Sequence, residues 1–294
     1  MAFIDLITQA RAQINLPSAS GTSDMTAITT LITACSRAIQ RYCKRLFVQC
    51  TFDELYSGRG ERSLYLRNYP INAITSVRYR PVTVTKITNN LANTPQARVS
   101  VTSTGITLWR NTNGTPYTDA NLTFAGNVNI GALEAAVNAV GNGWSAVSQG
   151  YDNWPSGDLY CPNGPTVGTD YLYTPAGQGN LQCVSGSYAE LKMHTYEMQG
   201  YQINERQGGL LRAIPYTDPE LLHPEDLIWP RGVNNYRVQY QAGFTTIPED
   251  VQEACAQLVA VQFKMDAREI SNVTIPPQIA QFLGVWRAQT ILMP

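Results

Sequence analysis

Residues 236–251, YRVQYQAGFTTIPEDV, change their structural period within a few positions. From Tyr236 to Tyr240, aromatic and branched side chains alternate with polar ones, which predicts a strand with one buried face. A turn containing alanine and glycine follows. Pro248 and the two acidic residues after it suit the first turn of a helix, where proline loses no hydrogen bond and carboxylates favour the positive end of the helix dipole. The stretch therefore predicts a strand, a turn and a helix in direct succession.

Both ends of the chain carry apolar residues at helical spacing. The helix after Pro248 is expected to place Val251, Cys255, Leu258 and Met265 on one face. Near the N-terminus, steps of three and four predict an amphipathic helix of about six turns. That longer stripe consists of Met25, Ile28, Ile32, Cys35, Ile39, Tyr42 and Leu46. Because each stripe needs an apolar partner, we expect the terminal helices to pack together.

Two shorter helical segments lie outside these. The spacing of Phe3, Ile7, Ala10 and Ile14 predicts a short N-terminal helix that ends before Pro17. At the other end, a last amphipathic segment is predicted after the break at residues 274–277. It carries Ile279, Phe282, Leu283 and Trp286, and an apolar tail follows with Ile291, Leu292 and Met293.

The middle of the chain is rich in strand signals. Alternation at residues 52–56, 64–66 and 75–79 predicts a short antiparallel meander, and runs of Val, Ile and Thr at 81–125 predict further strands. One compact helix is predicted at residues 130–140, and residues 143–230 are rich in turn formers. The expected fold class is α+β, with terminal amphipathic helices as a frame, short antiparallel strands and a β-rich and loop-rich central insertion. Residues 1–84 and 231–294 are expected to form the helical core, and residues 85–230 the insertion.

Composition narrows the class of protein. Only 15% of the residues are charged, against about 25% in an average globular protein, and the net charge is −1. Much of the surface is therefore uncharged and polar, which suits contacts with other subunits. The one basic cluster, Arg41, Lys44 and Arg45, lies at a predicted helix end, where cations complement the dipole, and this interpretation is favoured over phosphate binding.

The sequence predicts neither export nor membrane insertion, because it lacks a signal peptide and any run of about 18 apolar residues. Its six cysteines have neither metal-site spacing nor the framework of a small secreted domain, so reduced thiols are expected. Three of them lie at apolar positions of predicted helices, where cysteine behaves as a small hydrophobic residue.

Motifs of catalysis are absent from the sequence: it has no GxSxG elbow, P-loop, GxGxxG or HExxH pattern. Structural or surface roles are expected for the two histidines, His194 and His223. Asp152 and Asp158 flank Trp154 and suggest a carboxylate pair for glycoside cleavage or a cation site, but a polar loop carries such residues by chance. We therefore expect no enzyme activity, no catalytic residue, no cofactor and no metal.

Aromatic residues of the same region leave a second alternative open. They could stack on sugars in a carbohydrate-binding tail module, although packing in a core or at an interface is favoured, since tyrosine and tryptophan are enriched at protein interfaces. The residues are Trp144, Tyr151, Trp154, Tyr160, Tyr171 and Tyr173. A hydrolase that uses His194 or Asp158 is a further alternative.

Two segments resemble a known family. Residues 43–47, CKRLF, leading into a stretch with Tyr69-Pro70-Ile71, resemble the opening of head-to-tail connector (adaptor or head-completion) proteins of tailed phages. The strand, turn and helix at residues 236–251 resemble the same proteins, with Tyr240, Gly243 and Pro248 as the turn motif. The resemblance covers about residues 1–80 and 234–294, and the insertion at about 85–230 departs from it.

The resemblance implies a structural virion protein of the neck. Members of the family form a ring, usually a dodecamer, under the portal and extend the DNA channel toward the tail. The implied partners are the portal protein, a tail or stopper/terminator protein and further copies of the same chain. DNA would pass through without sequence-specific binding, no membrane is involved, and assembly takes place in the host cytoplasm.

The C-terminal segment is the predicted interface with the portal or a neighbouring subunit, because its apolar residues are difficult for one subunit to cover. The alternative is that the segment folds onto the core of its own subunit. The predicted interface residues are Ile279, Phe282, Leu283, Trp286, Ile291 and Leu292.

Overall fold

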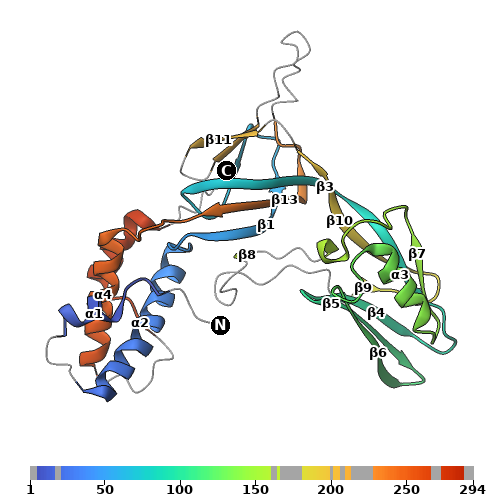
Figure 1. The fold of residues 1–294 in the computed structure, drawn as a ribbon, viewed down its shortest axis with the longest axis horizontal. Coiled ribbons are helices and arrows are strands. Elements are labelled where there is room, and N and C mark those ends of the chain that lie inside the picture. Colours follow the sequence, from blue (N-terminus) through green and yellow to red (C-terminus); the bar gives the residue numbers. More distant parts are fainter. Residues whose placement is uncertain are drawn as a thin grey trace, which may run out of the picture.

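The chain forms an arch with a helical lobe at one end and a mixed lobe at the other, joined by long strands (Figure 1). The computed structural model describes residues 5–16, 21–159, 164–165, 181–198, 201–205, 209–212, 228–265 and 273–287. Helices and antiparallel strands are both abundant, so the predicted α+β class is confirmed. No helix within these ranges is long and apolar enough to span a bilayer.

The main sheet is antiparallel and has the order β10-β3-β13-β1-β8, with β7 paired to β3 beside this path. Its strands are β1 (Cys50–Gly58), β3 (Ile71–Asn89), β7 (Trp144–Ser148), β8 (Gly164–Pro165), β10 (Ala189–Glu197) and β13 (Gly232–Ala242). The predicted meander was therefore wrong. The early strands β1 and β3 do not pair, because β13 returns from near the other end of the chain and lies between them.

The helical lobe contains the predicted terminal helices. It consists of α1 (Gln9–Ile14), α2 (Thr22–Cys43), α4 (Glu249–Lys264), α5 (Pro277–Phe282) and the 3-10 turn η4 (Leu283–Trp286). One apolar core joins α2 and α4, with Ile28, Ile39, Val251 and Leu258 all fully buried. The packing expected of the two ends is thus present.

Three positions of the predicted stripes are corrected. Ala10 and Ile14 are exposed, Ile14 at 67%, and Ala12 in the same short helix is buried instead. Met265 is 70% exposed because α4 ends at Lys264 and Met265 is only its C-cap. Phe3 and Pro17 lie outside the described residues.

At the opposite end lies the distal lobe, in which α3 (Ile130–Ala139) packs beside β7 (Figure 1). A four-stranded sheet of order β6-β5-β4-β9 completes it. These strands are β4 (Gln96–Val101), β5 (Gly105–Thr112), β6 (Thr115–Thr123) and β9 (Leu181–Gln182), and the short 3-10 turn η1 (Ser156–Leu159) lies near β10. Further strands and a compact helix were predicted here, and the structure confirms them.

A third group of strands lies over the middle of the arch. It has the order β11-β12-β2 and consists of β2 (Ser63–Tyr65), β11 (Tyr201–Glu205) and β12 (Gly209–Arg212). A separate apolar core beneath it contains the fully buried Trp229, Tyr236 and Tyr240. The division at residues 84/85 and 230/231 stays a prediction, and β3 extends continuously across the first of these positions.

Gly243 allows β13 to turn toward α4. Its φ is +104°, and a Cβ at this position would lie 2.5 Å from the carbonyl oxygen of Val48. Its amide also donates to the Pro70 carbonyl at 3.0 Å. The turn motif singled out in the sequence thus requires glycine for both conformation and space.

We expect Gly243→Ala to lower the free energy of unfolding by about 1–3 kcal/mol, measured by urea denaturation. Gly141→Ala is the matched control, because Gly141 has a φ of +72° but nothing within 4 Å of a Cβ. An equal loss in both variants would contradict a role for the close approach to Val48.

Candidate interaction site at the C-terminal segment

The segment formed by α5 and η4 is amphipathic, and its two faces have different surroundings. Ile279 is 5% and Leu283 0% exposed, and both belong to the apolar core of the helical lobe. Phe282 is 51% and Val285 81% exposed. One face of the segment is therefore covered by its own subunit, and the other face is open.

Trp286 packs this segment against the junction where α2 leads into β1 and β13 leads into α4. Its ring meets those of Phe47 and Phe244 edge-on, at centroid distances of 6.1 and 5.7 Å. Its Nε1 donates a hydrogen bond of 2.6 Å to Asp250 in the first turn of α4. Tyr42 of α2 adds a hydrogen bond from its hydroxyl to the Ala280 carbonyl at 3.1 Å.

The four predicted interface residues that the structure describes therefore divide into three groups. Ile279 and Leu283 are core residues, and Trp286 is partly buried against the same core. The side chain of Phe282 is half exposed and could contact a partner. Ile291 and Leu292 lie outside the described residues. Sequence reasoning did not single out Val285, although it is the more exposed of the two open apolar side chains. The role of the segment as an interface stays a prediction.

Arg45 belongs to the same junction and corrects an interpretation of the basic cluster. Lys44 is the left-handed C-cap of α2, as a helix-end residue should be, but Arg45 is only 1% exposed. Its guanidinium carbon lies 3.7 Å from the ring centroid of Tyr69 and 5.0 Å from that of Phe47, and its Nη2 donates to the Tyr69 carbonyl. Burial lowers the pKa of Arg45. A cation enclosed by aromatic faces is stabilised by their quadrupoles, so Arg45 is structural.

A buried carboxyl lies under the turn motif. Tyr240, fully buried, donates a hydrogen bond of 2.6 Å to Glu54, and Tyr56 donates to the same carboxyl. Asn68 adds a contact of 3.3 Å from its amide nitrogen. Burial raises the pKa of Glu54, while the hydrogen bonds from Tyr240 and Tyr56 oppose this rise. Sequence reasoning missed this network: Glu54 alternates in phase with Phe52 and Tyr56, but no local pattern shows that Tyr240 and Asn68 supply partners for its carboxyl.

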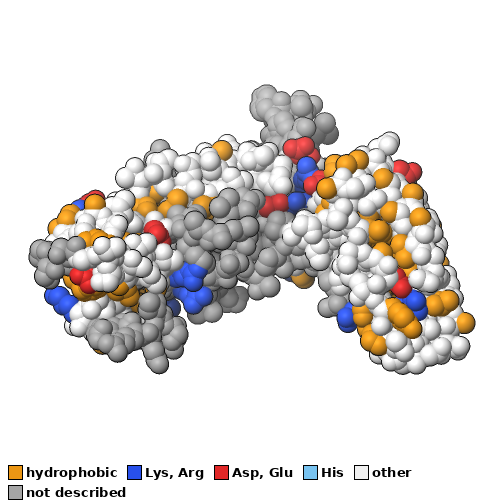
Figure 2. Space-filling view, turned by 60° about the horizontal axis from the view of Figure 1, so that its bottom comes forward, with side chains coloured by type: hydrophobic (Ala, Val, Ile, Leu, Met, Phe, Trp, Pro, Cys, Tyr) orange, Lys and Arg blue, Asp and Glu red, His pale blue; other side chains and the backbone are white. Residues whose placement is uncertain are grey.

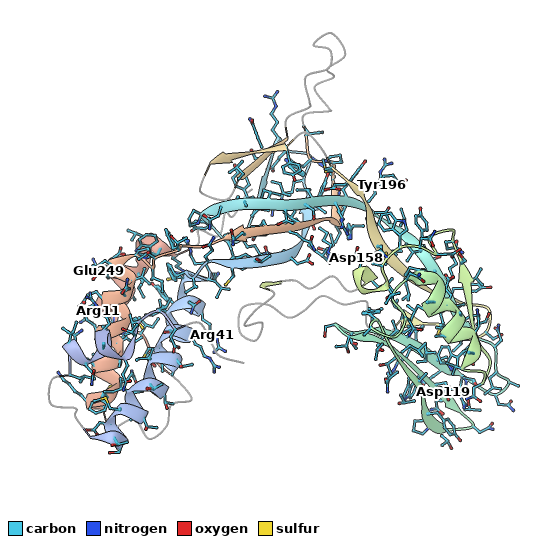
Figure 3. All side chains as sticks on the ribbon, in the orientation of Figure 1. Arg11, Arg41, Asp119, Asp158, Tyr196 and Glu249 are labelled. Atoms are coloured by element: carbon cyan, nitrogen blue, oxygen red, sulfur yellow. The ribbon has the colours of Figure 1, made fainter. Side chains whose placement is uncertain are left out.

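Asp158, one of the two candidate catalytic carboxylates, has structural partners. It forms an ion pair of 2.8 Å with Arg78 of β3 and lies 3.6 Å from Arg237 of β13. Arg237 in turn holds the buried Asp53 with two hydrogen bonds, of 2.9 and 2.7 Å. Asp158 therefore connects the distal lobe to the main sheet (Figure 3). Asp152 accepts a hydrogen bond from Ser148 instead.

Three of the aromatic residues considered for sugar stacking lie in the described part of the chain, and all three have contacts within the protein. Trp144 is 4% exposed and donates through Nε1 to Asp119 at 2.7 Å. Tyr151 and Trp154 meet edge-on at 6.3 Å and pack against the core of the distal lobe. This favours the packing interpretation for these three residues. Tyr160, Tyr171 and Tyr173 lie outside the described residues.

Reactive chemistry has little support in the described part of the chain. No group of three or more His, Cys, Asp or Glu side chains there could hold a metal ion. The described cysteines are free and buried, and burial raises the pKa of the Cys43, Cys183 and Cys255 thiols to about 12. Thiols with such pKa values are poor nucleophiles at neutral pH.

His194 lies in β10 and is 6% exposed. Its Nε2 lies 2.9 Å from the Asn234 carbonyl, so Nε2 carries the proton and donates, and the buried Nδ1 has no partner. Burial lowers the pKa of His194, and Arg237 and Arg78 add to this effect. This arrangement is a neutral structural histidine. His223 lies outside the described residues.

No protein-family model matches the sequence, and no curated protein matches it. One similar solved structure is a chain described as "Virion of native gene transfer agent (GTA) particle". The TM-score is 0.42 and the sequence identity 11%, over 98% of this chain and 93% of that chain. A likeness at this level does not define a family, an activity or a partner for this protein.

The neutral state of His194 predicts a pH dependence of stability. The unfolded chain binds a proton near the ordinary histidine pKa of 6.5, whereas the folded chain does so only at lower pH. Stability is therefore fully present above pH 6.5 and declines as the pH falls through the lowered pKa, by at most about 1.4 kcal/mol per pH unit.

His194→Gln keeps a donor for the Asn234 carbonyl and does not titrate. We expect the free energy of unfolding of the wild type to fall relative to this variant between pH 7 and 5, measured in urea at each pH. Parallel curves for the two proteins would contradict the assignment.

Proposed function

We propose that the chain is a structural subunit of a tailed-phage virion, and that it assembles into a ring-shaped head-to-tail connector between the portal and the tail. The observation that carries the proposal is the two-faced C-terminal segment, in which Ile279 and Leu283 are anchored in the subunit while Phe282 and Val285 face outward. An anchored helix with an open apolar face fits the groove of a neighbouring protein. No enzyme activity is part of the proposal.

The surface supports a structural role. Lys and Arg side chains lie in small, separate groups on the face shown in Figure 2, and the net charge is −1. Proteins that bind nucleic acid tightly have clusters of Lys and Arg on their surface, because binding depends on neutralising phosphates. A subunit without such a cluster on its visible face suits a channel through which DNA passes without tight binding.

The finer assignments come from the resemblance at residues 1–80 and 234–294. They are a dodecameric ring, a place in the neck beneath the portal, contact with a tail or stopper protein, and assembly in the host cytoplasm. The ordered helix-to-sheet junction around Trp286 gives the portal-facing segment a fixed position, which an interface requires.

The test replaces the open apolar side chains without touching the core. Deletion of residues 276–294 would also remove Ile279 and Leu283 from the core, so the double variant Phe282→Ser/Val285→Asp is the sharper choice. We expect it to keep the thermal stability of the wild type and to weaken binding to the portal of the same particle by at least about tenfold, because central apolar contacts dominate such interfaces. Binding is measured by light scattering and negative-stain imaging.

Val233→Asp is the matched control, because Val233 is also a highly exposed valine, at 85%, but lies at the start of β13. Unchanged portal binding by the Phe282→Ser/Val285→Asp protein would contradict the assignment of the interface. A wild-type protein that forms no rings and ignores portals, yet binds glycans through Trp154, would replace the connector proposal with the carbohydrate-binding alternative.

A further inference from the structure

Four oxygen-bearing side chains gather where α3 packs on the ladder of β3 and β7. Thr85 of β3 and Ser148 of β7 are opposite each other in that ladder. Glu134 of α3 contacts Thr85 and Asp152, and Asp152 accepts a hydrogen bond from Ser148. The backbone fixes Asp152 at this place, because its carbonyl accepts from the Gly131 amide in the first turn of α3 at 2.9 Å.

The buried Glu134 carboxyl has Thr85 and Asp152 as hydrogen-bonding partners, but one of its oxygens is left without any. Glu134 is 7% exposed, and its Oε1 atom is buried without a hydrogen-bond partner. The groups that act on this carboxyl are Thr85 and Asp152, and neither is a cation. Two adjacent carboxylates repel each other strongly in such surroundings, so the pair favours a bound positive species, either a proton or a metal cation.

We propose that Glu134 and Asp152, with the hydroxyls of Thr85 and Ser148, bind a Ca²⁺ ion between α3 and the β3–β7 ladder. The two carboxylates and two hydroxyls offer up to six oxygen atoms, and Ca²⁺ takes six to eight oxygen ligands in irregular geometry. The donor set contains no nitrogen or sulfur, which disfavours zinc. Asp152 is exposed whereas Glu134 is buried, so the ion reaches the site from the solvent side and keeps water ligands there.

Protonation of Glu134 opposes calcium binding at this site. Burial raises the pKa of Glu134, and the charge of Asp152 adds to this rise. Protons therefore compete with calcium for the pair, and calcium binding is expected to weaken as the pH falls.

A bound ion at this site would stabilise the packing of the distal lobe. The ion would join α3 to the long strand β3, which continues into the middle of the arch (Figure 1). A site with only two carboxylates belongs with the weak calcium sites, at dissociation constants on the order of 10⁻⁴ to 10⁻³ M. The proposal is independent of the connector role.

The test uses the full-length chain after treatment with EDTA. Titration calorimetry with CaCl₂ is expected to show one site per chain, and calcium at several millimolar is expected to raise the temperature of unfolding by several degrees. Glu134→Gln and Asp152→Asn should both abolish the heat and the shift. Glu190→Gln, which alters an exposed carboxylate on β10 paired with Lys86, should leave both unchanged. MgCl₂ should give a smaller shift, because Mg²⁺ demands regular octahedral geometry.

Absence of binding in the wild type would overturn the proposal, most directly if Glu134→Gln then stabilises the protein at neutral pH, since a proton alone would occupy the pair. Calcium binding that survives in Glu134→Gln and in Asp152→Asn would also overturn it, by placing the ion elsewhere. If Glu134→Gln does not fold, the exposed Asp152→Asn variant decides.

Discussion

The antiparallel pairing of β1 with β13 is the constraint on which the rest of the structure depends. In this register Cys50 lies opposite Ala242 and Tyr56 opposite Tyr236. Helix α2 leads into β1 after a short connection, and α4 follows β13 after the turn at Gly243. Because the paired strand ends lie side by side, both helices begin their packing at the same end of the sheet. The apolar stripes of α2 and α4 then pack against each other. The register of β1 and β13 thus determines where the helical lobe forms.

Polar groups inside the sheet explain why this register is unique. Glu54 is fully buried, which would cost free energy if its carboxyl lacked partners. Tyr56 and Tyr240 supply hydroxyl donors from the two paired strands, and Asn68 supplies an amide from the following loop. A slip of one residue would turn Glu54 to the opposite face and break this network. The same slip would separate Asp53 from Arg237. A shift in register would therefore cost free energy on both faces of the strand pair.

Local periodicity was sufficient to predict α2, α3, α4 and β13, because each is amphipathic over several turns or several alternations. The order of the strands was not predictable in this way. The partner of β1 lies far along the chain, and no local pattern distinguishes β13 from β3 as its neighbour. At the candidate site, the sequence identified the segment correctly as amphipathic, but Phe282 and Leu283 are adjacent apolar residues. Only the docking of α5 on α4 decides which of them is buried.

Burial of charge has a consequence for the surface. Several charged side chains are removed from solvent by specific partners in each part of the arch: Arg45 at the helical junction, Asp53 and Arg237 within the main sheet, and Arg110 in the distal lobe. A chain with only 15% charged residues therefore presents even fewer of them outside. Depletion of charge characterises the core of protein interfaces, whereas a protein that stays monomeric relies on charge for solvation. The ion pairs that stabilise this fold thus leave fewer charges on the surface, which agrees with the proposed role as a subunit of a larger assembly.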